Sequence, residues 1–283
     1  MDDEIRKMVA ETRGELAVLL AALPAEEWDG PTLCAGWRVR EAVAHITMPF
    51  RYSGRKFMLE LAKSRGNFNA MADRLARRDA AIRSAAELTA AVADNVDHPW
   101  KPPGGGFTGA LSHDVIHGLD IAVPCGVPWV IPPERLRHVL PASLTERSVK
   151  FFRADLAGVE FRASDMDWTL GSGSPLEGAA QDLLLAICGR RLPAGRLKGA
   201  PSSRFTSLAG LADGAAGGDL VQPALQDRAG RPLLGQRVEL GRLVDGVRGV
   251  PALLVQAGPE RLDVIRRGET RDVADHRGRG GLM

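Results

Sequence analysis

Helical periodicity dominates the first 125 residues and constrains the fold more than any other feature of the sequence. Four segments, residues 2–23, 39–63, 67–96 and 108–123, repeat apolar side chains three or four positions apart, which is the spacing of one helix face. Pro49 is expected to kink the second segment or to end its first half. Because the connections between the segments are short or irregular, the sequence predicts a four-helix bundle.

The period changes after one further helix, which is predicted over residues 133–152. Residues Val159–Ala163 alternate apolar and polar side chains, as a half-buried strand does, and Asp167–Leu170 reads as a second short strand. A helix with an apolar face is predicted within residues 175–191. The predicted fold class is therefore α+β and mainly α, with a small α/β module after the bundle.

Composition suggests where these parts end. All 14 aromatic residues precede Thr206, whereas the last 78 residues contain 14 of the 32 glycines, 11 arginines and no lysine. We therefore predict a bundle over residues 1–145, the α/β module over 146–205, and a poorly ordered Arg/Gly-rich extension over 206–283.

Charge and apolar content exclude several classes of protein. The net charge of +2 gives no electrostatic argument for nucleic acid as a partner. No apolar run reaches the roughly 18 residues that a membrane span needs, and the charged N-terminus lacks the apolar core of a signal peptide. Three widely spaced cysteines fit free thiols better than a disulfide framework. A cytoplasmic location is therefore expected.

Two histidines stand four residues apart in the fourth helical segment. This spacing places His113 and His117 on the same helix face, with Cβ atoms roughly 5–6 Å apart, so that both imidazoles could bind one metal ion. The same spacing also occurs by chance and on solvated surfaces. A third candidate, His45, lies among apolar residues of the second segment, either as a core histidine with satisfied hydrogen bonds or as a third ligand.

Three segments of the chain resemble one known family. They are WDGPTLCAGWRVREAVAH at Trp28–His45, HDVIHGLDIAVP at His113–Pro124, and DW at Asp167–Trp168 followed by GSGSPLEGAAQDLLLAICGRR. In order and spacing they are similar to the mycothiol-dependent maleylpyruvate isomerase family, within the DinB-like metalloenzyme superfamily. The resemblance extends over about residues 5 to 200, and nothing after residue 205 takes part in it.

The resemblance implies a DinB-like four-helix bundle that binds a divalent metal through His45, His113 and His117. Zinc is the expected ion, with nickel or manganese as alternatives, because imidazole suits several divalent cations. Asp120 is expected to accept a hydrogen bond from a ligand imidazole, and Asp114 is placed to do the same. The family's isomerase carries a glutamate at the position of His113, so the metal here would be more electrophilic and isomerisation of maleylpyruvate itself is a less secure expectation.

The function that follows is that of an enzyme using mycothiol on a small electrophilic substrate. A metal-bound thiolate could add to a double bond, giving isomerisation, or displace a leaving group, giving thiol transfer. The alternatives are a non-catalytic metal- or thiol-binding protein, a hydrolase that uses metal-bound water, and a bundle without metal. The expected partners are a small substrate and a low-molecular-weight thiol, and the chain is expected to be a monomer or homodimer.

Two further residues are candidates for the site. Arg190 is predicted as a catalytic group that neutralises a substrate carboxylate, although a cation near a helix C-terminus is the simpler explanation. Cys34 lies near the second helix, but a small buried apolar role is commoner for cysteine, so it is not assigned as a ligand.

Overall fold

The computed structural model describes residues 2–207 of the chain. Its helices and strands are, in order, α1 (Asp2–Ala22), α2 (Val39–Ile46), α3 (Met48–Arg51), α4 (Gly54–Lys63), α5 (Phe68–Ile82), α6 (Ala85–Ala93), α7 (Gly106–Ala122), α8 (Pro133–Ser143), α9 (Glu146–Phe152), β1 (Val159–Ala163), β2 (Thr169–Gly171), β3 (Ser174–Gly178) and α10 (Ala180–Ile187). No helix among these is long and apolar enough to cross a membrane. The extension predicted over 206–283 lies outside the described residues, apart from Thr206 and Ser207.

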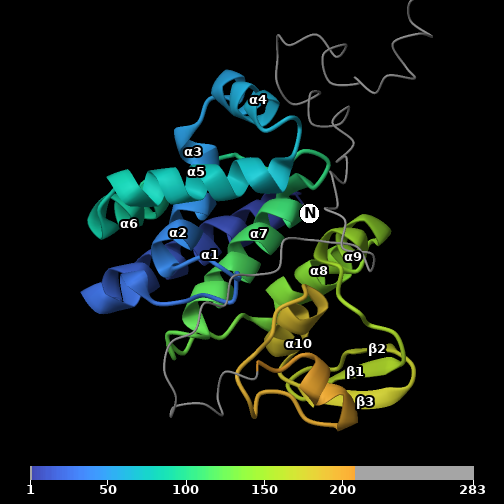
Figure 1. Cartoon of the computed structure of the whole chain (residues 1–283). Coiled ribbons are helices and arrows are strands. Elements are labelled where there is room, and N and C mark those ends of the chain that lie inside the picture. Colours follow the sequence, from blue (N-terminus) through green and yellow to red (C-terminus); the bar gives the residue numbers. More distant parts are fainter. Residues whose placement is uncertain (1, 208–283) are drawn as a thin grey trace, which may run out of the picture. The chain divides into compact units, whose positions relative to one another are not determined.

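The helices before residue 125 form the predicted bundle. Helix α1 packs against α6 and α7, and α2 packs against α5, α6 and α7 (Figure 1). The apolar stripe of α1 is buried at the expected spacing: Ile5, Met8, Val9, Leu16, Leu19 and Leu20. The mainly helical α+β class predicted from the sequence is therefore confirmed.

Three of the predicted helices are divided, the second into α2, α3 and α4 and the other two into two helices each, which corrects their predicted lengths. The helix predicted over 67–96 ends at Ile82, and α6 begins after Ser84, whose side chain accepts a hydrogen bond from the Glu87 backbone while Glu87 bonds back to Ser84. The second predicted helix ends at Ile46, before Pro49, as proline favours. The helix predicted over 133–152 is split into α8 and α9, and Thr145 caps the second of them.

The module after α9 contains a sheet of three strands in the order β2-β1-β3. Strand β1 has the predicted bounds and pairs antiparallel with β2. Strand β3 was not predicted, because its sequence SPLEG was taken as the start of the following helix. It pairs parallel with β1, which places Leu176 beside Phe161, and both side chains are buried.

Helices α1 and α7 both contribute to the two hydrophobic cores. One core extends from the start of α1 through α7 and α8 to β1 and α10, and it includes Ile5, Leu119 and Leu184. The other lies between α1, α2 and α6 and includes the end of α7, at Ile121. Because α7 is packed on both sides, the side chains it presents are held on a rigid support. The boundary predicted after residue 145 stays a prediction.

Candidate metal centre

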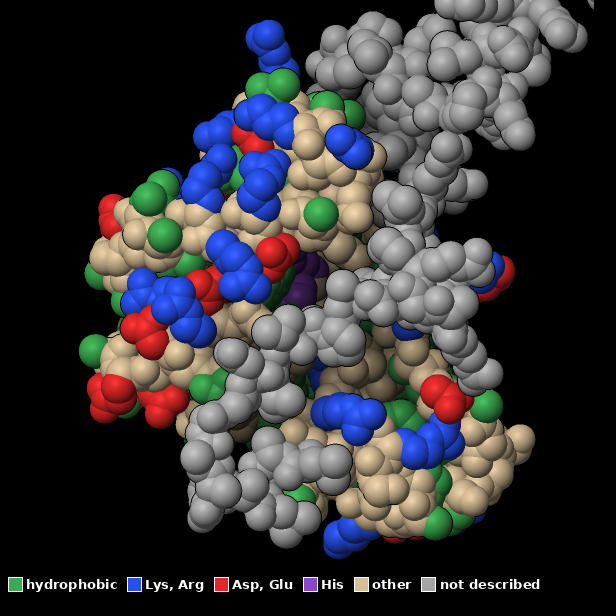
Figure 2. All heavy atoms as spheres, viewed as in Figure 1, with side chains coloured by type: hydrophobic (Ala, Val, Ile, Leu, Met, Phe, Trp, Pro, Cys, Tyr) green, Lys and Arg blue, Asp and Glu red, His purple; other side chains and the backbone are tan. Residues whose placement is uncertain are grey.

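Helix α7 presents two imidazoles one turn apart, as their spacing predicts. The ring centroids of His113 and His117 lie 4.9 Å apart. Their side chains are 15% and 16% exposed, so neither ring is sealed from solvent. In the space-filling view, histidine side chains are visible at the floor of a hollow (Figure 2). A small ligand can therefore reach this pair.

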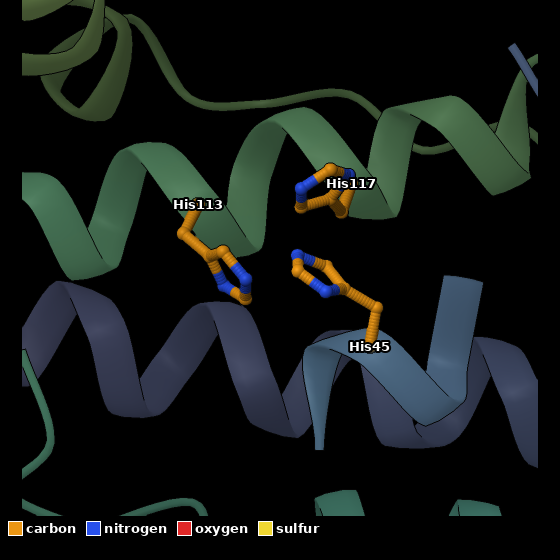
Figure 3. Close-up of side chains that lie close together, drawn as sticks. All are labelled: His45, His113 and His117. Carbon is orange, nitrogen blue, oxygen red and sulfur yellow. The ribbon is translucent and has the colours of Figure 1, made fainter. Parts of the chain in front are cut away.

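His45 approaches the same point from helix α2. Its ring centroid lies 5.2 Å from that of His113 and 4.9 Å from that of His117. One ring nitrogen from each histidine can be chosen so that all three atoms lie within 4.8 Å of one another. Figure 3 shows the three side chains converging, two from α7 and one from α2. The structure thus brings together the three residues that the sequence singled out.

The state of His45 indicates whether a cation fits between these rings. His45 is 8% exposed, and its Nδ1 makes no hydrogen bond to any residue the structure describes. Burial lowers the pKa of His45 well below its usual value, and the neighbouring His117 and His113 act in the same direction. A neutral imidazole keeps an unshared electron pair that a divalent cation can accept. Three imidazole ligands suit zinc and related divalent ions, so the residues fit a metal.

Asp120 holds the ring of His117 by a hydrogen bond. Its Oδ2 lies 3.0 Å from Nδ1 of His117, and Arg190 contacts both carboxylate oxygens, at 2.8 and 2.9 Å. Burial alone would raise the pKa of Asp120, but the Arg190 guanidinium and His117 outweigh it and hold that pKa below its usual range. A carboxylate can only accept a hydrogen bond, so Nδ1 of His117 carries the proton and Nε2 is left free.

Asp114 serves the other imidazole of α7. Its Oδ1 lies 2.9 Å from Nδ1 of His113, and the carboxylate is completely buried. The sequence offered Asp114 as an acceptor without showing which histidine it serves. The structure pairs it with its immediate neighbour, so each imidazole of α7 has a carboxylate of its own.

Arg190 comes from the chain just after α10 and is fixed by its ion pair with Asp120. Its Nη1 also donates to the backbone oxygen of Cys188, at 3.1 Å. The guanidinium therefore stands behind a carboxylate that orients an imidazole. Its predicted contact with a substrate carboxylate stays a prediction.

Cys34 is a neighbour of the site that sequence reasoning left out. Its thiol donates to Oδ2 of Asp120 at 2.9 Å, and its sulfur lies 3.6 Å from Nδ1 of His117 and 3.4 Å from Nη2 of Arg190. Burial raises the pKa of Cys34 well above its usual value, so the thiol stays protonated. Cys34, His117 and Asp120 also lie close enough to hold a cation. That place already has the positive charge of Arg190, which favours the three-histidine grouping for a metal.

Two tryptophan rings flank the imidazoles. Trp37 lies against His45 with 5.0 Å between ring centroids, and Trp100 lies against His113 at 5.1 Å. Nε1 of Trp37 donates to Asp73 at 2.8 Å, which fixes that ring. These apolar surfaces lower the polarity around the nitrogen ligands, and a metal's bound groups respond to that surrounding.

Comparison with known proteins identifies the N-terminal part of the chain. Residues 9–100 match the family described as "Mycothiol maleylpyruvate isomerase N-terminal domain". Among solved structures, a crystal structure of a histidine-to-alanine mutant of the mycothiol-dependent maleylpyruvate isomerase is 12% identical, with a TM-score of 0.48, and covers 71% of this chain and 94% of that chain. A crystal structure of the isomerase itself is 14% identical, with a TM-score of 0.41 and the same coverage of 71% and 94%. No curated protein matches the chain.

The family match includes part of the site. His45 and Cys34 lie within the matched residues, whereas His113, His117 and Arg190 lie after them. The match agrees with the resemblance inferred from the segment Trp28–His45. Over residues 9–100 the chain is therefore similar to the family of the mycothiol maleylpyruvate isomerase N-terminal domain.

Proposed function

We propose that this protein is a metal- and mycothiol-dependent enzyme with a DinB-like bundle, acting on a small electrophilic substrate. The reaction would be thiol-assisted isomerisation, or thiol transfer in which the thiolate displaces a leaving group from the substrate. The observation that carries the proposal is the convergence of three imidazoles, one ring nitrogen of each lying within 4.8 Å of the others. The family match over residues 9–100 supports the choice of mycothiol as the thiol and of the reaction class.

Each residue of the site has a distinct task in this proposal. His45, His113 and His117 would hold the cation, with zinc expected before nickel or manganese. A divalent cation held by three neutral imidazoles stabilises a thiolate or hydroxide in its open position at neutral pH. Asp114 and Asp120 would keep the protons of His113 and His117 on Nδ1. The unprotonated Nε2 atoms would then be free to coordinate the cation.

The hollow above the imidazoles suits a small substrate together with a thiol. His113 and His117 are partly exposed there, while His45 lies beneath them and is buried. Trp37 and Trp100 cover the flanks of the rings and restrict how much water reaches the nitrogen atoms. The site therefore has an open side, where ligands can enter, and a closed side, where the nitrogen ligands are held in place.

Turnover in the presence of the thiol tests this function. The full-length protein, supplied with zinc, nickel or manganese, is assayed with mycothiol against a panel of small electrophiles that includes maleylpyruvate. We expect product only when metal and thiol are both present, and loss of turnover in His45→Ala. The matched control is His138→Ala, which alters a histidine on α8 outside the site and should retain full turnover.

Other outcomes identify the competing functions. Binding of metal and thiol without product from any electrophile would indicate a non-catalytic binding protein. Metal-dependent hydrolysis that does not need the thiol would indicate a hydrolase. Either outcome contradicts the proposal. The cytoplasmic location and the monomeric or homodimeric state stay predictions.

A further inference from the structure

Helix α1 contributes to the candidate metal centre a residue that no sequence motif indicated. We propose that Arg13 is a positioning residue, which acts through Asp114 to hold the ring of His113 with Nδ1 protonated and Nε2 free for a cation. The inference rests on the metal centre proposed above. It adds to that centre an arginine that is 101 positions from Asp114 in the chain.

The contacts form an unbroken line from α1 to the imidazole. Nε of Arg13 donates to Oδ2 of Asp114 at 2.7 Å, and Oδ1 of the same carboxylate lies 2.9 Å from Nδ1 of His113. The side chains of Arg13 and Asp114 are 0% and 1% exposed. Each carboxylate oxygen thus serves one partner, so the position of the guanidinium determines how Asp114 faces the ring.

Arg13 is itself held in one place. Its Nη1 donates to three backbone oxygens after α6, those of Asn95, Val96 and His98. The guanidinium carbon lies 4.9 Å from the centroid of the Phe50 ring. Because these contacts come from three separate parts of the bundle, the guanidinium cannot move without disturbing them. This rigidity is what a group that orients another residue needs.

A purely structural role explains this ion pair less well. Two charges removed from water pay a desolvation cost that their mutual attraction often fails to recover, and apolar residues of similar size commonly stabilise a fold at least as well. Nη2 of Arg13 is also buried without a hydrogen-bond partner among the described residues. An arginine that is costly to bury and incompletely satisfied is better explained by what it does to Asp114.

The same order of groups occurs on the other flank of α7. There Arg190 pairs with Asp120, and Asp120 contacts Nδ1 of His117. Both imidazoles of α7 are therefore backed by a carboxylate and a guanidinium. In both cases one carboxylate contacts the guanidinium and the imidazole Nδ1 together. His45, which comes from α2, has no such partner on Nδ1 among the described residues.

The test removes the ion pair without leaving a buried charge. In the double variant Arg13→Met/Asp114→Leu, both charges are replaced by apolar side chains, which preserves folding where a single substitution would strand the partner. Zinc affinity of the full-length protein is measured by competition with a chelator, and stability by urea unfolding. We expect the zinc dissociation constant to rise about 10- to 100-fold while the metal-free protein remains as stable as the wild type or more so.

A second ion pair of α1, in which the arginine is buried and the glutamate is partly exposed, provides the control. Arg135 of α8 contacts Glu15 at 2.7 Å, and neither residue touches an imidazole of the site. In Arg135→Met/Glu15→Gln, glutamine can still accept from Trp129, and zinc affinity should equal that of the wild type. An Arg13→Met/Asp114→Leu protein that is folded and binds zinc as tightly as the wild type would overturn the inference.

The protonation pattern of His113 gives a readout that does not depend on metal. In nitrogen-15 NMR of the metal-free protein, neutral His113 should carry its proton on Nδ1, and the double variant should lose this preference. The same Nδ1 proton in both proteins would contradict the role of the Arg13–Asp114 pair even if zinc does not bind. Failure of the wild type to bind zinc, with the NMR result as expected, would instead contradict the metal centre alone.

Discussion

Carboxylates in this bundle are buried only beside a cation. Asp114 pairs with Arg13, Asp120 with Arg190, and Glu60 with Lys63 and Arg74. In the first two cases the carboxylate also contacts an imidazole, so the pair serves the candidate site. In the third case no imidazole is involved, and the contact joins α4 to α5. Glu60 therefore shows what such a pair contributes to stability by itself.

Acid should remove the contribution of Glu60. Hydrogen bonds from Lys63 and Arg74 lower the pKa of Glu60 from 4.5 to about 2. The folded state therefore favours the ionised form of Glu60 more than the unfolded chain does. The stabilising effect of this carboxylate is complete above about pH 4.5 and is lost as the pH falls toward 2. Urea unfolding should show Glu60→Gln less stable than the wild type at pH 6, with a smaller difference at pH 3.

An exposed ion pair supplies the control for this prediction. In Glu146→Gln the substituted carboxylate is 84% exposed and paired with Lys150, and exposed pairs contribute little to stability. Its unfolding should follow the wild type at both values of pH. A difference between Glu60→Gln and the wild type that stays constant from pH 6 to pH 3 would contradict the assignment.

Helix α7, which carries His113 and His117, packs tightly against Trp129 at Gly118. An added Cβ at Gly118 would lie 2.2 and 2.6 Å from two ring atoms of Trp129. Trp129 cannot easily withdraw, since its Nε1 donates to Glu15 and its backbone oxygen accepts from Gln181. The glycine beside His117 thus allows α7 to sit close to the segment that follows it.

Gly118→Ala should destabilise the protein although alanine is the better helix former. Overpacking a core costs about 1–3 kcal/mol, whereas alanine gains up to about 1 kcal/mol over glycine inside a helix. Gly14→Ala on α1 is the matched control, because nothing lies within 4 Å of its added Cβ. Thermal unfolding should show a lower midpoint for Gly118→Ala and an equal or higher one for Gly14→Ala. A higher midpoint for both would show that Trp129 yields freely.

The elements also show what periodicity can predict. Helix α1 ends at Ala22, next to the predicted boundary at residue 23, because its apolar stripe stops before Pro24. The break between α5 and α6 was missed, although Ser84 and Glu87 form a capping pair that the sequence displays. Strand β3 was missed for a different reason: its pairing with β1 is a tertiary contact, and SPLEG alone has no strand period.

At the scale of the whole molecule, the site draws on segments far apart in the chain. The three histidines could be proposed from spacing, apolar context and family resemblance. The ion pairs of Arg13 with Asp114 and of Arg190 with Asp120 could not, since the partners lie 101 and 70 positions apart in the chain. Such pairings are determined by how the helices pack, and no local pattern in the sequence predicts that packing.

One shared core explains why these distant groups stay in register. The core that contains Leu119 of α7 also contains Val9 of α1 and Leu184 of α10. Arg13 is one of the buried residues of α1, and Arg190 lies shortly after the end of α10. Helix α7 is thus held between the two elements that supply the guanidiniums, and the imidazoles it presents are oriented from both sides.

Metal content is the most direct test of this account. The full-length protein is reconstituted with zinc, freed of excess ion and measured by plasma mass spectrometry beside His117→Ala and the control His138→Ala. The account predicts a single bound cation per chain in the wild type and in His138→Ala, and its loss in His117→Ala, because two imidazoles hold a divalent ion far less firmly than three. Undiminished zinc in a folded His117→Ala protein, or none in the wild type, would contradict it.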